Sequence, residues 1–154
     1  MKKSSITPIS SDTQLLLNHV YQGCQMGMDS VHRLVQRTQD DQTRDLLLDL
    51  AHEHRRIMSL AAEGLRPYRT APEDLSAFDR MRTRLVSMQA HGPKTKRRIS
   101  QTLILGSRMA LRSLMRDLRK YPLAQNSSQQ LVGELIELEK RTLREGIRMA
   151  KKAS

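Results

Sequence analysis

Apolar residues recur every three or four positions along most of the chain, which is the spacing of one face of an α-helix. The pattern predicts four long helices over residues 12–37, 42–65, 94–120 and 128–151, with a shorter helix over 75–90. Alternation of apolar and polar residues, which would indicate a strand, does not extend over a useful length. We therefore expect an all-α protein.

The links between these helices predict their arrangement. Only about four residues separate the first two long helices, and a short link after Pro122 separates the last two, so each pair should form an antiparallel hairpin. We expect a four-helix bundle of two such hairpins, joined by a long crossover that contains the extra short helix. Residues 1–11 should be a flexible N-terminal segment, and 12–152 a single helical domain.

The apolar faces of the helices predict the core, and a few polar or small residues fall on them. Gly27 lies on the face of the first long helix, where a residue without a side chain lets a neighbouring helix approach closely. On the inward stripe of the third long helix we expect Ser107 and no acidic residue. The last has a broad face, made up of Leu131, Val132, Leu135, Ile136, Leu138, Thr142, Leu143, Gly146, Ile147 and Ala150, with Glu139 in its middle.

This order of helices resembles that of the ferritin-like bundles, which also join two hairpins by a long crossover. Ferritin-like di-metal proteins place a Glu on each of two helices and a Glu-x-x-His motif on each of the other two, all facing inward. In this chain His54 faces inward, but Ala51 stands at the Glu position of its motif. Glu139 also faces inward, but Thr142 stands where the His of that motif should be.

The other two long helices also lack the carboxylates of that pattern. The first offers Cys24 at its inward face, and the third offers Ser107. The chain is similar in this respect to small bacterial ferritin-like bundles that have no assigned role. The resemblance therefore implies a bundle without a cofactor or the di-metal chemistry, in which His54 and Glu139 are the remaining candidate metal ligands.

No complete catalytic signature is present in the sequence. His54 and Glu139 could pair across the core, which would satisfy the hydrogen-bonding needs of both, or His54 could bind a metal. Cys24 has no His or Arg at helical spacing to stabilise a thiolate, so we expect a small buried residue there. Motifs for phosphate-binding loops, serine hydrolases, dithiol redox centres and zinc proteases are missing. We therefore predict that the protein is not an enzyme.

Charge is concentrated in one segment of the chain. The protein has 27 Lys and Arg against 16 Asp and Glu, a net charge of +11, and residues 80–120 carry this whole excess, with Asp117 as their only acid. A field of one sign attracts a polyanion or an acidic partner, although a solvated helix face that favours solubility is the alternative. The candidate polyanion-binding residues are Lys94, Lys96, Arg97, Arg98, Arg108, Arg112, Arg116, Arg119 and Lys120.

Several features bear on the cellular location. No apolar run reaches the length of about 18 residues that a membrane span needs. The polar segment 1–10 lacks the apolar stretch of a signal peptide. The single cysteine excludes a disulfide framework and fits a reducing compartment. We expect a cytoplasmic protein.

Three functional hypotheses follow. In the first, a noncatalytic helical bundle acts by association, either with itself as a homo-oligomer or with an acidic protein. In the second, residues 80–120 bind nucleic acid or another polyanion without sequence preference. The scarcity of aromatic residues argues against base stacking, and no helix-turn-helix pattern is evident. The third is a di-metal oxidase with an unusual ligand set built on His54 and Glu139.

Overall fold

The computed structural model describes residues 7–73 and 96–153, and all regular secondary structure within them is helical. The elements are α1 (Pro8–Arg37), α2 (Asp41–Leu65), a single 3₁₀ turn η1 (Arg66–Tyr68), α4 (Lys96–Lys120) and α5 (Asn126–Lys152). These elements confirm the all-α class and the four long helices. The predicted short helix over 75–90 lies outside the described residues.

Helix α1 begins at Pro8, four residues before the predicted start at Asp12, so residues 8–11 are helical. The cause is a cap that the periodicity did not reveal. Thr7 lies just before the helix, and its hydroxyl accepts a hydrogen bond from the Ser10 amide at 3.2 Å. Proline fits the first helical position because its backbone has no N–H that would need a partner.

The other helix starts follow from local contacts as well. Asp40 caps α2 by accepting a hydrogen bond from the Thr43 amide at 2.9 Å, as is usual for an Asp at this position. Helix α5 begins at Asn126, two residues before the predicted Ser128, and has no side-chain cap. The backbone of Gln125, just before α5, instead donates to the Thr13 hydroxyl of α1 at 2.9 Å. The start of the last helix is therefore fixed to the first helix.

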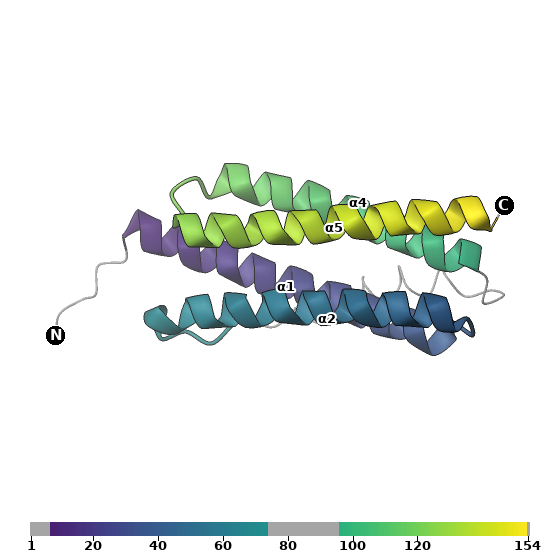
Figure 1. Ribbon diagram of the computed structural model, residues 1–154. Coiled ribbons are helices and arrows are strands. Elements are labelled where there is room, and N and C mark those ends of the chain that lie inside the picture. Colours follow the sequence, from purple (N-terminus) through teal and green to yellow (C-terminus); the bar gives the residue numbers. More distant parts are fainter. Residues whose placement is uncertain (1–6, 74–95, 154) are drawn as a thin grey trace.

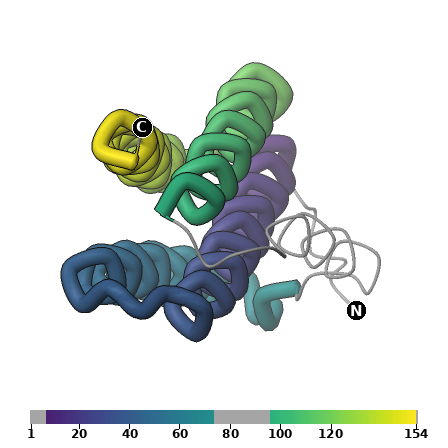
Figure 2. The backbone as a smooth tube through the Cα atoms, turned by 90° about the vertical axis from the view of Figure 1, so that its right-hand side faces the viewer, coloured from purple at the N-terminus to yellow at the C-terminus, as the bar shows by residue number. Residues whose placement is uncertain are grey.

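The four helices form two hairpins that pack against each other (Figures 1 and 2). Contacts are most extensive within the α1–α2 and α4–α5 hairpins, and the hairpins meet chiefly through α2 and α5. In Figure 1, α2 ends at one end of the bundle and α4 begins at the other. There the Lys96 ammonium lies 3.6 Å from Asp40, close to the α1–α2 turn. None of the described helices has the length and apolar character needed to cross a membrane.

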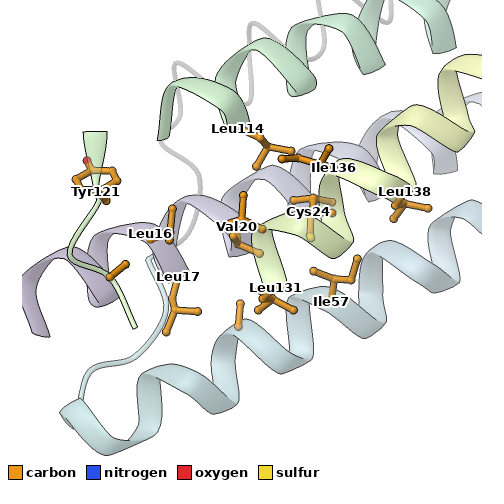
Figure 3. Packing of buried hydrophobic residues seen from close by; sticks show 14 of the residues in the cluster. Leu16, Leu17, Val20, Cys24, Ile57, Leu114, Tyr121, Leu131, Ile136 and Leu138 are labelled. Atoms are coloured by element: carbon orange, nitrogen blue, oxygen red, sulfur yellow. The ribbon is translucent and has the colours of Figure 1, made fainter. Parts of the chain in front are cut away.

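The core lies between the hairpins, where side chains from all four helices meet (Figure 3). Its largest cluster contains Leu16, Leu17, Val20, Cys24, Leu50, Ile57, Ala61, Leu65, Leu114, Tyr121, Ala124, Leu131, Val132, Leu135, Ile136 and Leu138. Most of these positions were predicted from the helical period. The apolar face of α5 is narrower than predicted, because Leu143, Ile147 and Ala150 are only half-buried.

Candidate functional site

His54 of α2 and Glu139 of α5 form a buried pair between the hairpins. His54 Nε2 lies 2.8 Å from Glu139 Oε1, and the two residues are 1% and 5% exposed. His54 Nδ1 lies 2.7 Å from the Leu50 carbonyl oxygen. Because a carbonyl only accepts, Nδ1 carries a hydrogen and donates it, and the bond between Nε2 and Glu139 holds a further proton. Of the two roles that the sequence left open for His54, pairing with Glu139 or binding a metal, the structure shows the pairing with Glu139.

The protonation of this pair depends on opposing effects. Burial lowers the pKa of His54, but the hydrogen bond that His54 donates to Glu139, the charge of Glu139, the hydrogen bond to the Leu50 carbonyl and the charge of Glu53 outweigh it, and the pKa is raised overall. A raised pKa favours the form in which an imidazolium faces a carboxylate. The pair is buried and connects the two hairpins, and the raised pKa of His54 favours its charged form.

The surroundings of this pair do not fit the di-metal site of the ferritin-like proteins. Both ring nitrogens of His54 are already engaged in hydrogen bonds. The backbone of α1 also closes one side of the ring, since a Cβ atom added at Gly27 would lie 2.6 Å from His54 Nε2. Across the described ranges, no three His, Cys, Asp or Glu residues are grouped so that they could hold a metal ion.

Cys24 is buried in the core, as predicted. Burial raises the pKa of its thiol, and the charge of Glu139 raises it further. A nucleophilic cysteine needs the opposite environment, one that stabilises the thiolate. Cys24 therefore acts as a small core residue.

Asp117 is a buried acid on α4, and the expectation that this inward stripe carries none is wrong. Asp117 is 6% exposed, and its carboxylate lies 3.1 Å from Nδ1 of His19 on α1. The ring of His19 makes an edge-on contact with Tyr121, at 5.5 Å between ring centroids. The signal in the sequence is the spacing of Asp117, three residues after Leu114 and four before Tyr121, which are both core positions. This spacing alone does not indicate burial, because Asp117 is charged and a charged residue is buried only with a partner, which here lies 98 residues away in the sequence.

The predicted polyanion-binding residues lie in different environments. Most of them are exposed on α4, namely Arg97, Arg108, Arg112, Arg116, Arg119 and Lys120. Arg98 is half-buried, and Lys96 pairs with Asp40. Lys94 lies outside the described residues. The structure therefore brings together five exposed arginines, which we call the α4 arginine face: Arg97, Arg108, Arg112, Arg116 and Arg119.

The α4 arginine face forms one stripe along the helix. At about 100° per residue, its five members fall within roughly a 100° sector opposite the buried positions Leu103 and Ser107. Two apolar residues, Leu105 and Met115, lie in the same sector and are 44% and 48% exposed. The only acid of α4, Asp117, is turned toward the core. The stripe is therefore basic and partly apolar.

Several basic residues of α2 and α5, unlike those of the α4 arginine face, form ion pairs with described acids. Arg56 pairs with Glu53 and Glu134, Arg141 with Asp49, and other cations of α2 and α5 also have nearby acids. No carboxylate in the described part of the chain lies within ion-pair distance of the five arginines. Their charge therefore remains available to a partner.

Comparisons of this chain with protein families, with curated proteins and with solved structures find no match. The resemblance to ferritin-like bundles accordingly stays a prediction that rests on the order of the helices.

Proposed function

We propose that this protein is a noncatalytic helical bundle, similar in its order of helices to the ferritin-like bundles, that binds an acidic protein through the α4 arginine face. The observation that carries this proposal is the stripe itself, in which five exposed arginines have no nearby acid among the described residues. Charges in this arrangement accelerate encounter with a partner of the opposite sign and align it on the surface.

The chemistry of the core supports a binding role rather than a catalytic one. The thiol of Cys24 is buried and its pKa is raised, so it is a poor nucleophile. Both ring nitrogens of His54 are engaged, Nδ1 with Leu50 of its own helix and Nε2 with Glu139 of α5, and neither is left to transfer a proton to a substrate.

Two exposed apolar side chains favour a protein partner over a nucleic acid. Leu105 and Met115 lie among the arginines, where a protein surface can bury them. A phosphate backbone offers no such contact, and proteins that bind single-stranded nucleic acid without base readout add aromatic stacking to charge. Tyr121, the tyrosine next to this helix, is 6% exposed and lies in the core.

A second copy of this chain is a poorer partner for this surface. Two α4 arginine faces would bring like charges together, which is unfavourable at short distance. Self-association would therefore use another part of the surface. An acidic amphipathic helix has both the charge and the apolar side chains to complement this stripe.

The test uses a synthetic helical peptide with Glu and Leu three and four residues apart, and binding is measured by fluorescence anisotropy. We expect the peptide to bind, and we expect more salt to weaken binding because exposed charges are screened over about 8 Å at physiological ionic strength. Reversing Arg97, Arg108 and Arg119 to Glu should weaken it by about tenfold or more, since each exposed pair contributes up to about 1 kcal/mol.

A matched variant separates the position of the charge from its amount. Reversing the exposed Arg55, Arg66 and Arg144, which lie on other elements, changes the net charge equally and should leave peptide binding within about twofold. Equal losses in both triple variants would contradict the proposal. A DNA duplex that binds more tightly than the peptide would replace it with the nucleic-acid alternative.

A further inference from the structure

A cavity of about 530 Å³ lies between α1 and α4. These two helices approach each other with few contacts, and small residues such as Gly23, Gly106 and Ser113 lie along their facing sides. Apolar side chains, among them Leu34 and Leu114, line much of the space. A cavity of this size with apolar walls is typical of sites that bind small molecules.

One buried polar group in this cavity has no hydrogen-bond partner among the residues that the structure describes. Ser107 is 2% exposed, and its hydroxyl oxygen makes no hydrogen bond with any described residue. A buried hydroxyl without a partner costs free energy, so such groups in proteins are nearly always satisfied. Ser107 lines the cavity together with the His54–Glu139 pair, and these buried residues form its inner end. A ligand group placed there would supply the missing hydrogen bond.

The outer end of the cavity is positively charged. Arg112 and Arg116 line it and are exposed to solvent. The only acid of α4, Asp117, also lines the cavity, but it is held by His19 at 3.1 Å. Arg112 and Arg116 follow Ser107 by five and nine residues, which corresponds to about 8 and 14 Å along the helix axis. The two polar ends are thus separated by the length of a short apolar chain.

From this geometry we propose that the cavity binds a small amphipathic acid that also carries a hydroxyl group. Its carboxylate contacts Arg112 and Arg116, its apolar chain lies between α1 and α4, and its hydroxyl bonds to Ser107 at the inner end. Arg112 and Arg116 also belong to the α4 arginine face, so the outer end of this site overlaps the surface proposed for the protein partner. The inner end does not, because Ser107 lies on the side of α4 that faces away from solvent.

The test is calorimetric titration of the full chain with octanoate, ω-hydroxyoctanoate and octylamine. We expect both acids to bind, the hydroxy acid about fivefold more tightly because of its added hydrogen bond, and the amine not to bind. Replacing Ser107 with Ala should remove the preference for the hydroxy acid. In the ligand-free protein the same variant should have an equal or higher melting temperature, because it removes a hydroxyl without a partner.

Matched variants make this test specific. Replacing the exposed Ser113 with Ala should keep the preference for the hydroxy acid. Replacing Arg112 and Arg116 with Gln should weaken both acids by about tenfold, whereas Arg97 and Arg108, which do not line the cavity, should tolerate the same change. Failure of both acids to bind, binding of the amine as tightly as octanoate, or an unchanged preference in the Ser107 variant would each overturn the proposal.

Discussion

At the scale of single residues, the contact between His54 and Glu139 determines how the core responds to pH. Glu139 supplies the charge and the hydrogen bond that keep the pKa of His54 raised despite its burial. A group with a raised folded-state pKa adds stability below its unfolded pKa, about 6.5 for histidine, and this stability is lost as the pH rises through the folded-state pKa.

We therefore expect the Glu139→Gln variant to change the pH dependence of stability. Without the carboxylate, the lowering by burial, which is the largest single effect on His54, is opposed only by the hydrogen bond to Leu50 and the charge of Glu53. The pKa of His54 should therefore fall, and the variant should lose stability toward acid rather than toward base. The check is the free energy of unfolding in urea, measured at about pH 6 and about pH 9. The difference between the wild type and the Gln variant should be larger at about pH 6 than at about pH 9. The exposed His52, replaced with Ala, is the control that should leave the pH profile unchanged. Parallel profiles for the wild type and the Gln variant would contradict this account.

At the scale of the helices, the sequence predicted which side of each helix is buried better than it predicted which residues of the neighbouring helices that side contacts. The helical period identified Leu16, Val20 and His54 as inward positions, and all three are buried. It also placed Gly27 on the inward face of the first helix, but it did not predict which residue Gly27 contacts. The partner is the ring of His54 from α2, and such contacts depend on the relative rotation of two helices, which one helix cannot encode by itself.

The close approach of α1 and α2 leads to a prediction for Gly27. In the Gly27→Ala variant the new methyl carbon would lie 2.6 Å from His54, whose ring is held by two hydrogen bonds and cannot move away freely. We expect a loss of about 1–3 kcal/mol in the free energy of unfolding, as for other overpacked cores. The control is Gly133→Ala on α5, where nothing lies within 4 Å of the added Cβ. It should stabilise the protein by up to about 1 kcal/mol through helix propensity. Equal stability of the Gly27 variant and the wild type would contradict this packing.

At the scale of the whole molecule, contacts between residues far apart in sequence fix the two hairpins together. The Thr13 hydroxyl of α1 accepts the Gln125 amide, and Asp12 accepts the Leu123 amide, so the α4–α5 turn is attached to the start of α1. Neither contact follows from the sequence, because Thr13 and Gln125 are 112 residues apart and polar. The helices could be predicted because they follow from local periodicity. The buried Asp117 was missed because its burial, like these contacts, depends on a residue far away in the sequence.

This attachment can be tested through Thr13. In the Thr13→Val variant the shape of the side chain is kept, but the Gln125 amide loses its acceptor, and we expect a loss of about 1 kcal/mol of stability. Hydrogen exchange at the Gln125 amide should also become faster. The matched change Thr102→Val removes a hydroxyl that bonds only within its own helix, to the Arg98 carbonyl, and should leave exchange at Gln125 unaltered. Unaltered exchange at Gln125 in the Thr13 variant would show that this bond does not hold the turn.

The pairing of His54 with Glu139 has a consequence for how the molecule loses its structure. The histidine belongs to one hairpin and the glutamate to the other, and the walls of the cavity are likewise shared between α1 and α4. Separation of the hairpins would therefore abolish the ion pair and the cavity together, even while each hairpin kept its own helices. A ligand bound in that space would contact both hairpins and would therefore stabilise the protein against their separation.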